Sequence, residues 1–231
     1  MTEHRSESTA ESAAQSTTVL RHSKTVRAIH WAVALSGLTL LFSGFGELPM
    51  YKRYMLTDIP GMAWAGDFEI QLVIHYLAAI VFSAASLFHV VYHWRRREFE
   101  AVPRRGDVKE SVEIMKAMVR GTPEPPQRKF LAEQRLAYAA IGGTTAVLIL
   151  TGFLKSLKNF DTIAFGHTTQ TVITLVHTAS AMVFLLLFFA HMAAFLVKPN
   201  RPLFKTMFTG RVKLSYARHR HEKWDVEPEE A

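Results

Sequence analysis

The chain has 231 residues, a formal net charge of +7, no cysteine and 49% hydrophobic residues. The absence of cysteine excludes disulfide bonds, iron–sulfur clusters with cysteine ligands and covalently attached c-type heme in this subunit. The mean hydropathy is only +0.08, because long apolar blocks alternate with highly charged segments. The sequence contains no glycine-rich phosphate-binding motif and no hydrolase-type triad.

The order of polar and apolar segments predicts a membrane protein. Residues 1–20 have almost nothing to bury and are predicted to form a disordered tail. Four later blocks approach or exceed the roughly 20 apolar residues that cross a bilayer as a helix. We therefore predict an all-α integral membrane protein in which residues 21–200 form a four-helix bundle, followed by a tail over residues 201–231. The predicted spans are residues 28–46, 70–92, 137–154 and 171–197.

The basic residues predict how these spans are oriented. Of the 27 Lys and Arg residues, 23 lie on one side of the predicted membrane and only four, Lys52, Arg53, Lys155 and Lys158, on the other. The positive-inside rule then places both termini and the loop over residues 95–134 in the cytoplasm. The protein is expected in the cytoplasmic (inner) membrane. The net charge thus indicates topology and gives no argument for nucleic-acid binding.

Two of the loops have features of their own. In the central loop, apolar residues recur at helical spacing over residues 108–119, which predicts an amphipathic helix at the membrane surface. The outward loop over residues 48–67 contains prolines and aromatic residues. It is expected to hold either a short interfacial helix or a docking surface for an external partner, and the sequence leaves both open.

Histidines recur fourteen residues apart in two of the spans, as His75 and His89 and as His177 and His191. Fourteen residues turn through roughly 1400°, about 40° short of four full turns, and rise roughly 21 Å. Each pair therefore lies on one helix face, with its members near opposite sides of the membrane. Ionisable residues inside a bilayer are costly and mark functional sites, and imidazole is a common ligand of iron.

By depth, the histidines predict two b-type hemes stacked across the bilayer. His75 and His177 form the outer pair, and two axial histidines make a six-coordinate heme suited to electron transfer. In the inner layer His191 is common to both possible pairs, and its partner is either His30 or His89. A heme-free transporter that uses the same histidines is the alternative from another functional class. His22, His219 and His221 are predicted to be cytoplasmic surface residues.

From about Arg21 onward, the sequence resembles the cytochrome b (gamma) subunit of membrane-bound respiratory formate dehydrogenases. The wider family includes the cytochrome b subunits of nickel–iron hydrogenases and thiosulfate reductases. The likeness is strongest in the fourth span and the C-terminal tail. The matching residues are Arg27, His30-Trp31, Ala34 to Gly37, His177 to Ala181, Ala190 to Met192, Gly210-Arg211-Val212, the region of His219 and His221, and Trp224.

The resemblance implies a role for particular residues. It implies that His75 and His177 hold the outer heme and that His30 and His191 hold the inner heme. His89 has no counterpart among the family's ligands, and it stays an alternative to His30.

The resemblance also implies a quinone site at Lys129 to Arg135. There Lys129, Ala132 and Gln134 match the family pattern, and Arg135 is a like-charged exchange, whereas Leu131 and Glu133 depart from it. Glu133 is a candidate proton donor to the quinone. Alternatively, Gln134 and Arg135 merely cap the third span.

The function that follows is electron transfer within a larger complex. A periplasmic iron–sulfur (beta) subunit is expected to deliver electrons, and menaquinone or ubiquinone to accept them near the cytoplasmic heme. Formate oxidation is expected in a separate molybdenum or tungsten catalytic (alpha) subunit. Membrane lipid is a further expected partner, and no binding to nucleic acid is expected. The alternative within the same family is an equivalent role for a nickel–iron hydrogenase or a thiosulfate or polysulfide reductase.

Overall fold

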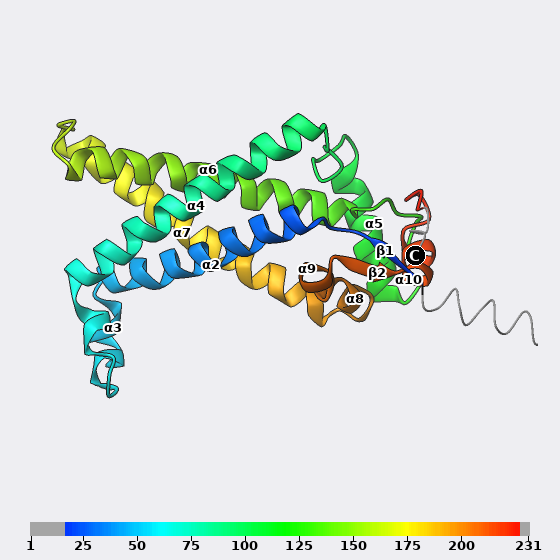
Figure 1. Ribbon diagram of the computed structural model, residues 1–231, viewed down its shortest axis with the longest axis horizontal. Helices are drawn as coiled ribbons and strands as arrows, with labels where there is room; N and C mark the ends of the chain where they lie inside the picture. The colour runs from blue at the N-terminus through cyan, green and yellow to red at the C-terminus, as the bar shows by residue number, and fades with distance from the viewer. Residues whose placement is uncertain (1–16, 227–231) are drawn as a thin grey trace, which may run out of the picture. The chain divides into compact units, whose positions relative to one another are not determined.

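The computed structural model describes residues 17–226, and most of them are helical (Figure 1). These residues divide into two compact units. We call residues 28–97 and 144–186 the core unit and the remainder, which includes both chain ends, the terminal unit. Three of the long helices contain a boundary between the two units, so each of these helices belongs partly to one unit and partly to the other.

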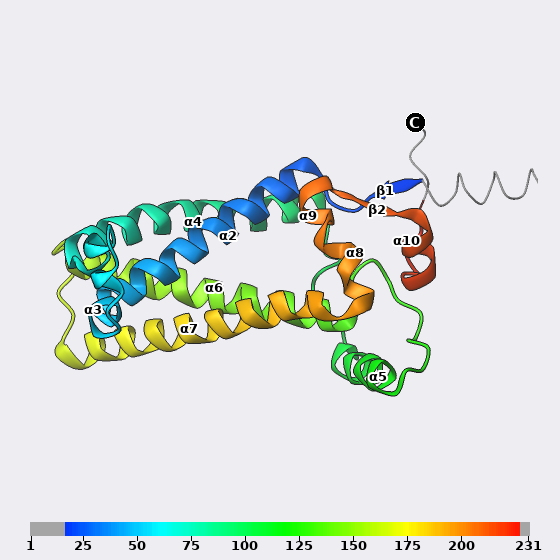
Figure 2. The same ribbon diagram turned by 90° about the horizontal axis from the view of Figure 1, so that it is seen from below.

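Four helices are long and apolar enough to cross a membrane, which confirms the four predicted spans within the described residues. The first three extend beyond their predicted apolar blocks at both ends, because polar residues continue the helix, whereas the fourth begins before its predicted block and its α-helix ends at Ala193, before the predicted end at residue 197. In the core unit α2 lies beside α4, and α6 beside α7 (Figure 2). The helices are α2 (Lys24–Glu47), α4 (Phe68–Arg96), α6 (Ala132–Asn159) and α7 (His167–Ala193), the last followed by the 3-10 turn η3 (Ala194–Leu196).

Local sequence signals fix the ends of α4. The Asp67 carboxylate accepts hydrogen bonds from the backbone N–H groups of Glu69 and Ile70, at 2.9 and 3.1 Å. A side chain that accepts from these unpaired N–H groups is a standard N-terminal cap. The helix ends at Arg96, and the next residue, Arg97, has a left-handed φ of 54°. Basic residues in the last turn are favoured by the C-terminal end of the helix dipole.

The segment between α2 and α4 contains short helical turns: α3 (Met50–Arg53), η1 (Leu56–Asp58) and η2 (Ala63–Gly66). The Tyr51 hydroxyl ties α3 to α2 by donating to the carbonyl oxygen of Phe42 at 2.7 Å. Tyr54 and Met55 stay largely exposed. The predicted short helix is thus present, whereas the docking role of this loop stays a prediction.

The central loop contains α5 (Asp107–Arg120), so the amphipathic helix predicted there is confirmed as a helix. Ile114 and Ala117 are buried on one face, while Val112 and Val119 are exposed on the other. The buried Asp107 carboxylate accepts from Arg135 Nε at 2.8 Å and Nη2 at 2.6 Å. This two-bond ion pair joins the start of α5 to the start of α6.

The N-terminal prediction needs a correction, because residues 18–20 belong to the fold. Strand β1 (Thr18–Leu20) pairs antiparallel with β2 (Arg211–Lys213), and Val19 lies opposite Val212. Both valines are buried with Leu214 and Ala217. Residues 1–16, also predicted to be disordered, lie outside the described part. The C-terminal segment further contains η4 (Lys198–Asn200), α8 (Arg201–Phe204), α9 (Thr206–Thr209) and α10 (Leu214–Arg220).

Two histidines predicted to be surface residues are buried instead. His22 is only 9% exposed and His221 is 0% exposed. His221 Nδ1 lies 2.6 Å from the carbonyl oxygen of Arg128. Since a carbonyl only accepts, Nδ1 carries the proton and Nε2 is the unprotonated nitrogen. Burial, together with the positive charge of Arg21, lowers the pKa of His221 from 6.5 to about 4.

We expect the stability of the terminal unit to fall as the pH drops from about 6.5 to 4. In that range the unfolded chain binds a proton at His221 and the folded chain does not, which costs up to about 3 kcal/mol. Thermal unfolding of the detergent-solubilised protein across this range measures the effect. His221→Gln keeps a donor for the Arg128 carbonyl and should flatten the pH dependence. The exposed His219→Gln is the control, and an equal pH dependence in both variants would contradict the prediction.

Candidate functional site

The structure brings together the histidine pair predicted for the outer cofactor. His75 on α4 and His177 on α7 both belong to the core unit. Their ring centroids are 6.4 Å apart, with the ring planes inclined at 63°. The two imidazoles therefore lie close together on separate helices, as two axial ligands of one metal must.

Each of these imidazoles contacts a hydroxyl on a neighbouring helix. Ser43 Oγ on α2 lies 2.9 Å from His75 Nδ1, and Thr151 Oγ1 on α6 lies 2.8 Å from His177 Nδ1. Each hydroxyl also lies within donating distance of a carbonyl oxygen of its own helix, that of Thr39 at 2.9 Å and that of Val147 at 2.7 Å.

A hydroxyl has a single proton, and when it donates that proton to a carbonyl its oxygen is left as an acceptor. The partner nitrogen Nδ1 must then be the N–H group of the imidazole. This hydrogen-bond pattern assigns the lone pair to Nε2 in both His75 and His177. Both rings are thereby prepared to bind a metal through Nε2.

A glycine follows each of the two hydroxyl residues. A Cβ atom at Gly44 would lie 3.7 Å from His75 Cε1, and one at Gly152 would lie 3.4 Å from His177 Cε1. A longer side chain at either position would push the ring out of place. The Ser43-Gly44 and Thr151-Gly152 pairs thus hold the two histidines by the same means.

The His75 side of the site carries further polar groups that the sequence reasoning missed. Glu47 Oε1 lies 3.6 Å from His75 Nδ1. Gln71, one turn before His75, is fully buried, and neither polar atom of its amide has a hydrogen-bond partner within the described chain. The sequence signal that could have revealed Gln71 is the presence of a glutamine inside an apolar span. A buried amide of this kind would be satisfied by a cofactor carboxylate or by water.

The residues at this site fit heme iron. A metal–imidazole bond of roughly 2 Å, plus roughly 1.1 Å from the nitrogen to the ring centre, puts two axial imidazoles about 6.3 Å apart. The observed centroid distance is 6.4 Å. Two neutral imidazoles are also the donor set of six-coordinate b-type heme. Distance, donor type and proton position therefore agree.

The same helix faces continue through the core in steps of seven residues. Seven residues rise roughly 10.5 Å and stop about 20° short of two turns. On α2, a Cβ at Gly37 would contact Phe82 at 3.2 Å and Phe184 at 3.4 Å. We name three levels by their α4 residue: the His75 level, the Phe82 level and the His89 level. Their residues on α2, α4 and α7 are Gly44, His75 and His177; Gly37, Phe82 and Phe184; and His30, His89 and His191.

The predicted inner ligands occupy the His89 level by sequence register. His30 packs edge-on against Trp31, with ring centroids 5.4 Å apart. The His89 ring lies 4.5 Å from the ring of His93. Both belong to the core unit, whereas His191 belongs to the terminal unit. The choice between His30 and His89 as the partner of His191 stays a prediction.

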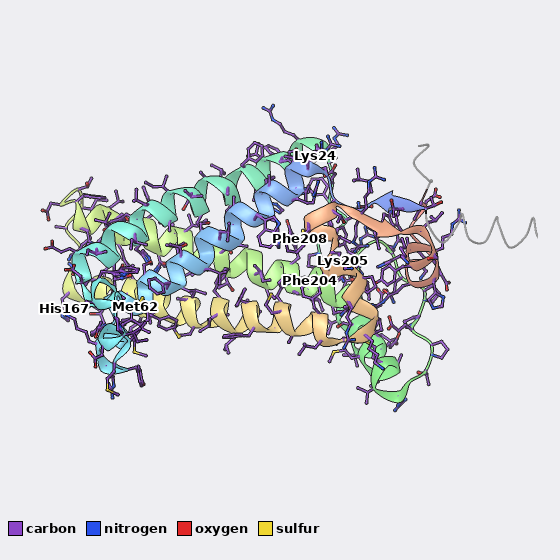
Figure 3. All side chains as sticks on the ribbon, turned by 60° about the horizontal axis from the view of Figure 1, so that its bottom comes forward. Lys24, Met62, His167, Phe204, Lys205 and Phe208 are labelled. Carbon is purple, nitrogen blue, oxygen red and sulfur yellow. The ribbon has the colours of Figure 1, made fainter. Side chains whose placement is uncertain are left out.

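His191 begins a row of aromatic rings within the terminal unit. Its ring lies 5.5 Å from that of Phe195, which lies 5.3 Å from Phe204. Phe204 in turn lies 5.6 Å from Phe208 (Figure 3). This row gives the inner histidine an apolar setting on the side of α8 and α9.

The three residues predicted for a quinone site have different surroundings. Arg135 is 2% exposed and is held by Asp107 and by the carbonyl oxygen of Phe130. Gln134 accepts from the backbone N–H of Leu131 at 3.2 Å, the side-chain cap of an N-terminal capping box. The alternative prediction, that both residues cap the third span, is confirmed for Gln134, whereas Arg135 instead forms an ion pair with Asp107 of α5. Glu133 differs, because its buried Oε2 makes no hydrogen bond to any described residue.

A family model described as prokaryotic cytochrome b561 matches residues 21–210. This range includes all four long helices and each histidine of the three levels. No curated protein matches the chain significantly.

We expect Ser43→Ala to weaken cofactor retention on the order of tenfold, the size of effect typical for a lost partner of a metal ligand. The variant removes the acceptor that fixes the proton on His75 Nδ1. The rate of heme transfer to excess apomyoglobin measures the change. Thr171→Ala is a matched control, since that hydroxyl bonds only to the His167 carbonyl of its own helix. Equal transfer rates for Ser43→Ala and the unmodified protein would contradict the assignment.

Proposed function

The chain belongs to the prokaryotic cytochrome b561 family, and from this premise we propose that it is the diheme cytochrome b subunit of a respiratory formate dehydrogenase. The family makes it an inner-membrane heme b electron-transfer subunit with a membrane-associated partner enzyme. The proposal adds the number of cofactors, the identity of the partner and the acceptor. The heme-free transporter is not carried forward, because the family is one of heme proteins.

The observation that carries the proposal is the His75–His177 pair, 6.4 Å apart between ring centroids. When bound, heme would supply a one-electron carrier, and two histidine ligands would suit it to electron transfer. His75 and His177 hold it through Nε2, while Ser43 and Thr151 hold the ring protons at Nδ1.

A second cofactor at the His89 level follows from the repeat. His191 lies fourteen residues beyond His177 on the continuous helix α7, and His30 or His89 supplies the opposite ligand. We propose His30, on the resemblance in the first span. Two carriers roughly 21 Å apart along the helix axis span most of a bilayer of roughly 30 Å.

The direction of transfer is proposed from charge and from resemblance. The side rich in Lys and Arg is the cytoplasmic side, so the His75 level lies toward the periplasm. Electrons then enter from an iron–sulfur subunit outside and reduce menaquinone or ubiquinone inside. Proton uptake from the cytoplasm would make the reaction electrogenic. The fourth span and the tail support formate dehydrogenase rather than hydrogenase or thiosulfate reductase as the partner.

We expect the purified protein to contain two hemes b per chain by pyridine hemochrome assay. His75→Ala and His177→Ala should each reduce this to one, because the site at the His75 level loses an axial ligand. His30→Ala and His89→Ala, compared in the same assay, identify the ligand opposite His191. A single heme in the unmodified protein would contradict the diheme proposal.

The partner is tested by co-purification from native membranes followed by metal analysis. Molybdenum or tungsten with formate-dependent reduction of the b hemes supports the proposal. Nickel would reassign the subunit to a hydrogenase. Molybdenum without formate activity would reassign it to a thiosulfate or polysulfide reductase.

For the quinone site, we propose that Glu133 is the proton-donating group, because its buried Oε2 makes no hydrogen bond to a described residue. Glu133→Gln should slow quinone reduction by about 10²-fold, within the usual contribution of general acid catalysis, and leave both hemes bound. The exposed Glu113→Gln on α5 is the control. A reduction rate in Glu133→Gln equal to that of the control would remove Glu133 from the proposed site.

A further inference from the structure

An aromatic pair lies midway along the core unit. Phe82 on α4 is only 3% exposed. Its ring centroid lies 6.0 Å from that of Phe184 on α7, and the rings meet edge to face at 84°. Phe82 is seven residues from both His75 and His89, and Phe184 is seven residues from both His177 and His191. The pair is therefore midway between the two histidine levels on both helices.

The third helix at this level presents backbone to the rings. A Cβ at Gly37 would lie 3.2 Å from Phe82 Cε2 and 3.4 Å from Phe184 Cζ. The two rings thus rest directly on α2, and even a methyl group would force one of them to shift. Gly37 itself is buried. Tight apolar packing of this kind leaves no room for a water molecule between α2 and the pair.

The four long helices carry no Asp, Glu, Lys, Arg or His side chain near this level. The segments 31–43, 76–88, 136–154 and 178–190 contain no Asp, Glu, Lys, Arg or His. The buried hydroxyl next to Gly37 is that of Ser36, and it donates within its own helix to the carbonyl of Ala32 at 2.5 Å. A proton would have to cross the Phe82 level without a titratable group to carry it.

We propose that Phe82 and Phe184, seated on Gly37, form a dry partition that blocks water and protons between the two histidine levels. A narrow apolar constriction excludes water and raises the free energy of any ion in it. The inference rests on the proposed diheme function. In that function electrons pass between the two levels, and protons are taken up on one side of the membrane only. A continuous water path through the bundle would let protons cross and dissipate the charge difference across the membrane.

The test is proton leakage through the purified holoprotein in sealed vesicles, without any enzymatic turnover. Valinomycin and a potassium gradient set the membrane potential, and an internal pH dye reports proton entry. The unmodified protein should leak no faster than empty vesicles. Phe82→Ala and Phe184→Ala should each raise the leak on the order of tenfold, which corresponds to about 1.4 kcal/mol off the barrier.

Matched controls lie on the same two helices. Phe88 on α4 is 53% exposed and Phe189 on α7 is 58% exposed. Phe88→Ala and Phe189→Ala remove the same ring volume away from the partition and should leave the leak unchanged. A leak in Phe82→Ala and Phe184→Ala no greater than in these controls would overturn the proposal.

Heme content, measured on the same preparations, separates this proposal from the proposed function. Two hemes with no added leak in the alanine variants would overturn the partition and leave the diheme function standing. Fewer than two hemes in the unmodified protein would reject the diheme function, while the leak comparison would still decide whether the pair is a barrier. If the alanine variants lose heme, Phe82→Tyr serves as the test variant, because it keeps the ring and adds a hydroxyl. It is expected to leak, and a tight Phe82→Tyr vesicle would count against the partition.

Discussion

The hydrogen bond between a helix hydroxyl and a histidine Nδ1 is the constraint on which this site depends. An imidazole buried in an apolar helix bundle needs a partner for its N–H, because an unpaired buried polar group costs roughly 1–3 kcal/mol. Ser43 and Thr151 meet this requirement with oxygens that have already given their own proton to a backbone carbonyl. The same bond orients the ring and leaves the lone pair on Nε2. Each bond also crosses between helices, so the pairings of α2 with α4 and of α6 with α7 are tied to the position of the ligands.

The seven-residue step explains how one set of helices can repeat this arrangement. Because seven residues fall only about 20° short of two turns, a residue type placed every seven positions stays on one helix face. On α4 and α7 that face alternates histidine, phenylalanine, histidine, and on α2 it runs glycine, glycine, histidine. Glycine lets the backbone of α2 approach the rings at Gly44 and Gly37. Large rings from two helices and bare backbone from a third are complementary in volume, as close packing requires.

The sequence predicted those features that depend on local composition. Apolar length defined the four spans, and His75 and His177 stood out because an ionisable side chain inside a span is rare. Ser43 and Thr151 gave no such signal, since a serine or threonine in a helix commonly bonds to its own carbonyls. The strand at Thr18–Leu20 depends on Arg211–Lys213, almost 200 residues away, and no local pattern records that pairing. The burial of His221 likewise depends on the distant Arg128 carbonyl. Gln134 and Arg135 were recognised as a motif, but their contacts with Leu131 and Asp107 became visible only in the structure.

The α2 face also bears on the choice between His30 and His89. At the two levels where its contacts are described, α2 contributes a glycine, and the rings come from α4 and α7. At the third level the same face carries His30, so a ligand-bearing side chain replaces the bare backbone only there. The His89 ring, in contrast, already packs against His93 on its own helix. The change from glycine to histidine on α2 therefore supports the proposal that His30, rather than His89, is an axial ligand.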